Sequence, residues 1–208
     1  MTQYGFYFDP SRCTGCKTCE LVCKDYYDLG PDILFRRIYD YEGGAWTRGA
    51  DGTWSNAAFN YHLSISCNHC DNPACVEMCP TGAMQKDAET GLVNTDPNVC
   101  IGCGTCQKSC PYDAPRIDAE LSRARKCDGC LARVRNGDDP MCVGACPLRA
   151  LEFGPIDELR EKHGDLCQVA PLPDPATGPN LVIGNCQAID SDAYDLEEGY
   201  VANPREVE

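Results

Sequence analysis

The chain has 208 residues, 18 of them cysteine, and a formal net charge of −14. The acidic balance argues against nucleic acid as a partner, and no run reaches the roughly 18 apolar residues that a membrane-spanning helix requires. The length allows one domain or two small ones. Because the 43% hydrophobic content includes 18 cysteines, we expect a modest core stabilised by bound metal.

The spacing of the cysteines indicates metal binding. Sixteen of the 18 fall into four groups of four, and each group starts with a two-residue gap. Disulfides and zinc are the alternatives. Zinc sites usually pair two Cys-x-x-Cys units, without a third cysteine two or four residues later or a fourth before proline. The N-terminus shows no basic region followed by an apolar stretch, so we expect no export signal of its own.

The first 60 residues predict a strand, a cysteine group and an insertion. A short strand over residues 4–8 leads into Cys13, Cys16, Cys19 and Cys23. A helix that begins at Cys19 can continue through Tyr26, because Lys24 stands where proline would follow the fourth cysteine. In the insertion, apolar and polar residues alternate, and Gly-Gly and Asp-Gly interrupt the alternation. This pattern predicts hairpins. We expect Trp46 and Trp54 there to pack locally, with a docking surface as the alternative.

The second group consists of Cys67, Cys70, Cys75 and Cys79, followed by Pro80 and preceded by a strand over residues 61–66. Its middle gap of four residues widens the loop without changing the number of ligands. His69 lies inside this loop. We interpret it as a solvent-facing or hydrogen-bonding histidine, with redox tuning or proton handling as the alternative.

The third group is the central motif of the chain. Cys100, Cys103, Cys106, Cys110 and Pro111 read C-x2-C-x2-C-x3-C-P, the run by which bacterial ferredoxins hold [4Fe–4S] clusters. Gly102 and Gly104 keep side chains from crowding the loop and leave N–H groups free to face the cluster. Residues 83–96, between the second and third groups, predict a hairpin.

The fourth group has an eleven-residue insertion between Cys130 and Cys142, and its outer members are Cys127 and Cys146. Beyond it, residues 155–164 predict a helix that glycine ends, and residues 171–179 are extended. We expect the acidic end, residues 190–208, to lie along a partner or stay mobile. Cys167 and Cys186 lie outside the four groups, so their spacing predicts that they are unliganded thiols.

In two-cluster ferredoxins the fourth cysteine of each group binds the other cluster. If the second and third groups form one pair, the first and fourth must pair across it, and one ferredoxin is nested inside another. Each [4Fe–4S] cluster then has one of four ligand sets: Cys13, Cys16, Cys19 and Cys146; Cys23, Cys127, Cys130 and Cys142; Cys67, Cys70, Cys75 and Cys110; and Cys79, Cys100, Cys103 and Cys106.

The predicted fold is therefore α+β, with two nested bacterial-ferredoxin-like modules. The expected domains are an outer module of residues 1–30 with 115–155, a hairpin insertion of 31–60, an inner module of 61–114, and a C-terminal helix with an extended tail of 156–208. Four cluster cores of about −2 each, thiolates included, would bring the loaded chain to roughly −22.

No phosphate-binding glycine loop and no nucleophile set is evident, and all motif cysteines are consumed as ligands. The chain is therefore predicted to be a non-catalytic relay, since several one-electron centres in a small protein conduct electrons between a donor and an acceptor. A free-standing polyferredoxin carrier for a soluble oxidoreductase is the alternative function, and a zinc-bound interaction protein is a third.

The order and spacing of the groups resemble the electron-transfer (iron–sulfur) subunit of the dimethyl sulfoxide reductase family of molybdopterin oxidoreductases. The resemblance also includes residues 4–6, 12–21, 35–39, 63–70, 146–151 and 153–160, and it weakens over 42–60 and after about residue 174. It implies a heterotrimer with a molybdopterin catalytic subunit and a membrane anchor subunit that oxidises menaquinol.

By that resemblance the Cys13 site faces the molybdenum subunit and the Cys100 site faces the quinol. Nitrate reductase relatives have tryptophan at the position of Cys103 and hold a [3Fe–4S] cluster, so cysteine here implies four irons. The resemblance also implies a peripheral location on the cytoplasmic membrane, on the outer face through the catalytic subunit's export signal, with the cytoplasmic face left open.

Overall fold

A three-stranded sheet joins the two ends of the cysteine-rich region in the computed structural model, which describes residues 2–207. Across the sheet, the strands are β10 (Leu151–Pro155), β1 (Tyr4–Phe8) and β11 (Leu181–Ile183). The predicted first strand is confirmed. Phe8 pairs with Leu151 in antiparallel register. Because Cys13 follows Phe8 closely and Cys146 shortly precedes Leu151, this pairing brings the first and fourth cysteine groups together.

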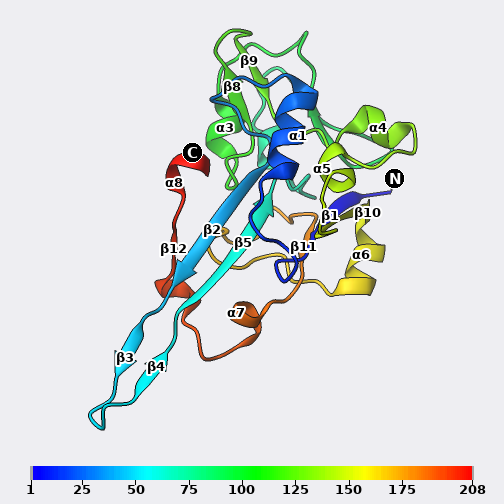
Figure 1. Cartoon of the computed structure of the whole chain (residues 1–208). Coiled ribbons are helices and arrows are strands. Elements are labelled where there is room, and N and C mark those ends of the chain that lie inside the picture. Colours follow the sequence, from blue (N-terminus) through cyan, green and yellow to red (C-terminus); the bar gives the residue numbers. More distant parts are fainter. Residues whose placement is uncertain (1, 208) are drawn as a thin grey trace.

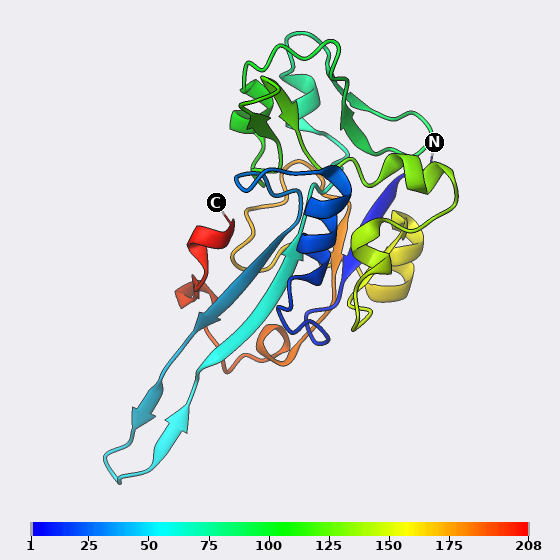
Figure 2. The ribbon, with the colours of Figure 1, turned by 45° about the horizontal axis from the view of Figure 1, so that its top comes forward.

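The second sheet is a long ribbon that extends beyond the rest of the chain (Figures 1 and 2). Residues 37 and 65 form the inner end of its central strand pair, so an insertion boundary at residue 60 falls within a strand. A separate pair of short strands continues the ribbon to its tip. In order, the strands are β12 (Tyr200–Val201), β2 (Arg37–Gly43) and β5 (Phe59–Ile65), with β3 (Trp46–Arg48) and β4 (Trp54–Asn56) at the tip.

The two tryptophans of the ribbon are exposed. Trp46 and Trp54 are each 61% accessible, and the strands that carry them lie on the projecting part of the ribbon (Figure 2). The expectation of local packing is therefore wrong. A two-stranded tip has no second layer to cover an indole ring, whereas the base of the same ribbon buries Tyr41, Phe59 and Tyr61 in the main core.

Five short helices begin within the cysteine groups or their insertion. They are α1 (Thr18–Tyr27), α2 (Ala74–Glu77), α3 (Thr105–Ser109), α4 (Leu131–Arg135) and α5 (Met141–Gly144). The predicted helix of the first group is confirmed in α1. Helix α1 packs against α5, and α2 packs against α3. The first group is thus adjacent to the fourth, and the second to the third, as nested modules require.

Two hairpins separate the later cysteine groups: β6 (Met84–Lys86) with β7 (Val93–Thr95), and β8 (Arg116–Asp118) with β9 (Arg123–Arg125). The first is the predicted hairpin. The second was not predicted, because its turn contains no glycine. Ser122 takes the left-handed conformation there, at φ 51°, so the usual turn signal is absent.

The C-terminal region packs on its own chain. Helix α6 (Ile156–His163) ends at Gly164, as predicted. The segment after it forms α7 (Gln187–Asp190), η1 (Leu196–Glu198), β12 and α8 (Pro204–Val207). Of the two expectations for residues 190–208, the one that they stay mobile is wrong for the described part, and the one that they lie along a partner stays a prediction. There β12 pairs with β2, and the Asn203 side chain accepts from Asp40 N at 2.9 Å and donates to Ile38 O at 2.8 Å.

None of the helices described between residues 2 and 207 combines the length and the apolar character needed to span a membrane.

Asn203→Ala should loosen this C-terminal segment. The change removes both side-chain hydrogen bonds to β2, at a cost of about 1–3 kcal/mol in local stability. Hydrogen exchange of the amides of residues 200–207 should become faster in the variant. Asp192→Ala, at an exposed position of the same segment, serves as the control and should leave the exchange unchanged. Equal exchange rates in Asn203→Ala and the unaltered protein would contradict the anchoring role.

Candidate iron–sulfur sites

Three cavities are each lined by four cysteines. The sets are Cys13, Cys16, Cys19 and Cys146; Cys67, Cys70, Cys75 and Cys110; and Cys79, Cys100, Cys103 and Cys106. The three cavities are similar in size, as expected for sites that bind the same group. Each cavity combines three cysteines of one group with the fourth cysteine of another. The structure thus brings together three of the sets that ligand exchange predicts.

The remaining four motif cysteines also lie near one another. Burial raises the pKa of the Cys23 thiol, and the thiolates of Cys127, Cys142 and Cys130 raise it further. Burial likewise raises the pKa of Cys127 to about 12. Packing gives the same placement: Cys23 and Cys127 share one buried cluster, and helix α1, which carries Cys23, packs against α5, which carries Cys142.

Two of the cavities reach the surface through an exposed cysteine. Cys16 and Cys103 are both exposed, and each has a threonine hydroxyl, of Thr18 or Thr105, at 3.4 Å from its sulfur. That hydrogen bond is the main reason why the pKa of each thiol lies below its ordinary value. The two loops share the pattern Cys-x-Thr-Cys, and in both the threonine opens a helix, α1 or α3.

The other two sites are mostly buried. Cys23, Cys127, Cys130 and Cys142 are all buried, and so are Cys67 and Cys75. Burial raises the pKa of Cys75 to about 12. A buried thiol with a raised pKa needs a cation beside it before it can be a thiolate, and iron supplies that charge.

Backbone amides also point at the cysteine sulfurs. Ala124, in β9, donates to Cys100 Sγ at 3.3 Å, and Ala150, next to β10, donates to Cys146 Sγ at 3.3 Å. The sequence did not indicate these donors, because any residue carries an N–H group. Their position depends on the hairpins and strands that follow each loop. N–H donors of this kind stabilise a ligand thiolate and tune the cluster it binds.

Gly102 and Gly104 have different roles in the third loop. Both have positive φ, 68° and 74°. A Cβ on Gly102 would lie 2.3 Å from the carbonyl oxygen of Ser122, whereas on Gly104 the nearest atom would be a side-chain carbon of Ile117 at 3.8 Å. Gly102 is therefore needed for space as well as for conformation, and Gly104 for conformation alone.

His69 is completely buried, so the solvent-facing interpretation is wrong and the hydrogen-bonding one is confirmed. Its Nδ1 accepts from Val93 N at 2.9 Å, and its Nε2 lies 4.0 Å from Cys127 Sγ. Burial, with Lys126 nearby, lowers the pKa of the imidazole well below its ordinary value. The ring is neutral, and because Nδ1 accepts, the proton is on Nε2 and faces the sulfur.

Neither Cys167 nor Cys186 lines any of the three cavities. Both are half-buried, and Cys186 packs against the main core. Between residues 2 and 207, no group of three or more His, Cys, Asp or Glu side chains is arranged to hold a single metal ion. Twelve of the sixteen motif cysteines instead line the three cavities described above.

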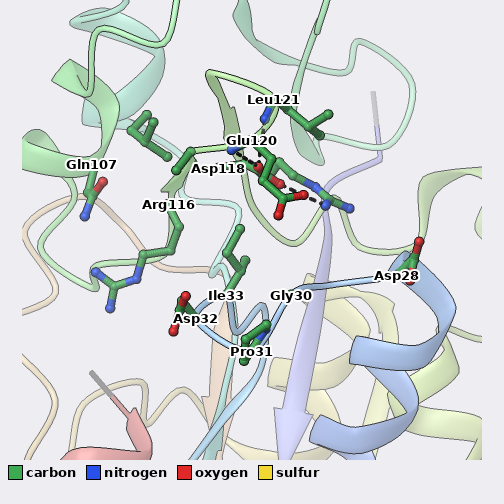
Figure 3. Close-up of a pocket in the computed structure, with 13 residues that line it drawn as sticks. Asp28, Gly30, Pro31, Asp32, Ile33, Gln107, Arg116, Asp118, Glu120 and Leu121 are labelled. Carbon is green, nitrogen blue, oxygen red and sulfur yellow. Dashed lines mark hydrogen bonds and ion pairs between the residues drawn. The ribbon is translucent and has the colours of Figure 1, made fainter.

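A wider, cysteine-free cleft lies between the segment after α1 and the β8–β9 hairpin (Figure 3). Its arginines already have acidic partners: Arg116 with Asp113 at 2.5 Å and Arg125 with Asp118 at 3.2 Å. Asp118 also accepts from two backbone amides of its own turn. These contacts stabilise the hairpin, and we assign no chemistry to the cleft.

Comparison with known proteins identifies iron–sulfur domains in the chain. Residues 6–25 match a 4Fe-4S binding domain, and residues 58–156 match a 4Fe-4S dicluster domain. The protein is 58% identical over 207 residues to the probable anaerobic dimethyl sulfoxide reductase chain YnfG of Escherichia coli, covering 99% of each chain. It is 55% identical over 210 residues to an anaerobic dimethyl sulfoxide reductase chain of Haemophilus influenzae, covering 100% of each, and 33% identical to protein NrfC of E. coli over 81% of this chain and 73% of that one.

The fold and the thiolate sites define an iron–sulfur protein built of α+β ferredoxin-like modules, and four thiolates per site fit a [4Fe–4S] cluster. More narrowly, the protein belongs to the family of the iron–sulfur subunit of anaerobic dimethyl sulfoxide reductase.

Gly102→Ala should weaken the Cys100 site. A Cβ at this position costs about 1–2 kcal/mol in left-handed backbone conformation and also clashes with the Ser122 carbonyl. We expect less iron per chain and loss of one cluster signal. Gly137→Ala is the matched control: φ is 81° there, but no atom lies within 4 Å of the added Cβ. Equal iron contents in the two variants would show that the clash does not matter.

Proposed function

We propose that the protein is the electron-transfer subunit of a membrane-associated molybdopterin reductase similar to dimethyl sulfoxide reductase. It relays electrons from a quinol-oxidising membrane anchor subunit to a molybdenum catalytic subunit and is not itself catalytic. Family membership supports this proposal, because the relatives are named as chains of an anaerobic dimethyl sulfoxide reductase.

The proposal includes four [4Fe–4S] clusters, held by the cysteine sets that ligand exchange predicts. When bound, each cluster supplies a one-electron redox centre. Three sets are supported by a cavity that their own four cysteines line. The fourth, Cys23 with Cys127, Cys130 and Cys142, is supported by the mutual effect of these thiols on pKa.

The observation that carries the proposal is that the four cysteine sets lie next to one another in a row. The first and the last set each contain an exposed cysteine. Cys19 and Cys142 share one core cluster and Cys67 and Cys127 share another, so each pair joins two adjacent sets. Cys75 and Cys106 share one apolar cluster, which joins the last two sets. Only short steps therefore separate successive sites, from Cys16 at one exposed end to Cys103 at the other.

An exposed apolar side chain lies at each of the two exposed ends. Ile101, 65% accessible, lines the cavity that contains Cys103, and Leu148, 40% accessible, lines the cavity that contains Cys16. Exposed apolar groups beside a redox site suit a surface that a partner covers. The exposed tryptophans of the ribbon tip suit the docking interpretation as well. We propose a heterotrimer in which the Cys16 end faces the catalytic subunit and the Cys103 end faces the anchor.

Native purification tests the assembly. A relay subunit should elute together with a large molybdenum-containing chain, and the complex should be recovered peripherally on the cytoplasmic membrane, on its outer face. Iron and acid-labile sulfide should each approach about 16 per copy of this chain. A chain that elutes alone with full iron content would instead support the free-standing polyferredoxin carrier, and a colourless chain containing zinc would contradict both.

Cys103→Ser should convert one [4Fe–4S] cluster to [3Fe–4S]. A serine hydroxyl is a poorer iron ligand than a thiolate, and the exposed position of Cys103 lets the iron escape to solvent. Low-temperature EPR of the oxidised protein should show a new signal. Cys167→Ser, at a cysteine outside the ligand sets, should leave the spectrum as it is. An unchanged spectrum in Cys103→Ser would remove Cys103 from the ligand set.

A further inference from the structure

Arg36 is a buried cation surrounded by neutral partners. Only 2% of it is accessible, and the ion pairs formed within residues 2–207 do not include it. Nη1 donates to Ser64 O at 2.9 Å and to Ser64 Oγ at 3.1 Å, and Nη2 donates to Ser66 Oγ at 3.0 Å. The guanidinium lies over the Phe6 ring at 4.9 Å. A buried charge with only neutral partners is costly, so a counter-charge must be close by.

Cysteines from two different ligand sets pack around Arg36: the Phe6 ring beneath its guanidinium belongs to the core cluster that contains both Cys19 and Cys142. Burial acts to lower the pKa of Arg36, but the thiolates of Cys142, Cys19, Cys127 and Cys23 raise it, and the net pKa is raised. In return, the charge and a hydrogen bond of Arg36 oppose the rise that burial causes in the pKa of Cys142. Cys19 belongs to the first proposed site and the other three to the second. Arg36 therefore lies at the junction of these two sites.

Ser64 connects Arg36 to the first site. Its Oγ accepts from Arg36, because a guanidinium can only donate. The same Oγ lies 3.3 Å from Cys19 Sγ. When Cys19 is an iron-bound thiolate it has no proton, so the Ser64 hydroxyl must be the donor in that contact.

We propose that Arg36 is the shared counter-cation of the two outer-module sites and raises the reduction potential of both. Ser64 extends this effect to Cys19 by a hydrogen bond. Reduction adds one electron to a site and no proton, so the site becomes more negative while Arg36 keeps its charge. A fixed cation in a dry interior favours that reduced state. This inference rests on the proposed ligand sets.

The neighbouring arginine provides a matched control. Arg37 is also buried, at 3% accessible, but it faces other groups. It donates to the carbonyl oxygens of Tyr112, Asp113 and Val207 and lies 3.7 Å from the Asp113 carboxylate. Removal of Arg37 deletes a buried cation of the same kind that already has a carboxylate partner.

Potentiometric EPR of the native complex tests the inference. In Arg36→Met, two of the four midpoint potentials should become more negative and the other two should stay. Arg36→Lys, which keeps the charge, should shift the same two by less. Arg37→Met should shift none. Unchanged midpoints in an Arg36→Met protein with full iron, or an equal shift of all four, would overturn the proposal.

Ser64→Ala provides an independent measurement, because it removes a small hydroxyl and leaves the buried charge. It should lower one midpoint only, that of the Cys19 site. If Arg36→Met fails to retain iron, this variant decides: one lowered midpoint supports the proposal, and four unchanged midpoints refute it. The unaltered complex separates this inference from the ligand sets. If it lacks four clusters, the ligand sets fail; if it has them, only the role of Arg36 is under test.

Discussion

The constraint on which this structure depends is the repulsion among sixteen closely spaced thiolates in a chain that is already acidic. Most of these sulfurs lie in buried or half-buried places, where burial holds thiol pKa values such as that of Cys127 at about 12. A thiolate in such a place is stable only beside positive charge or N–H donors. Iron supplies most of that charge. The chain supplies the rest through backbone amides and two buried cations, Arg36 and Lys126. Lys126 lines the Cys67 cavity and donates to the carbonyl oxygen of Cys127 at 2.8 Å.

The topology follows from the need to close each site with a cysteine from another group. The β1–β10 pair and the packing of α1 on α5 bring residues near the two ends of the cysteine-rich region together. The α2–α3 contact does the same for the two inner groups. Because these contacts join segments far apart in sequence, folding and metal binding are coupled. Each cavity gains its fourth sulfur only when the long-range pairing has formed, and iron in the cavity in turn stabilises that pairing.

The sequence predicted the parts of the site that depend on covalent spacing. Two-residue gaps identify the loops, and the exchange rule places Cys146 with Cys13 without any structure. The parts that depend on the surroundings could not be predicted. His69 is adjacent in sequence to Cys70, and nothing in its own loop shows that Val93 and Cys127 enclose it. Arg36 and Arg37 are consecutive, yet only Arg36 lies among the thiolates. The exposed tryptophans and the folded tail were missed for the same reason. Burial of Trp46 or Trp54 depends on whether a second layer covers the ribbon tip, and local alternation carries no information about that.

The contrast between buried and exposed sites determines where the chain can set reduction potentials by itself. At the Cys23 site, which is dry, a single guanidinium or a neutral imidazole N–H acts with little screening. At the exposed sides of the Cys16 and Cys103 sites, water screens nearby charges more strongly. The reduction potential of the buried Cys23 site is therefore set by this chain, through Arg36 and His69. In the proposed complex, the potentials at the two ends would also depend on the docked partners, because docking would remove the solvent that screens nearby charges. In the proposed relay, the buried central sites would keep constant reduction potentials. The potential at each exposed end would change with the partner that covers it.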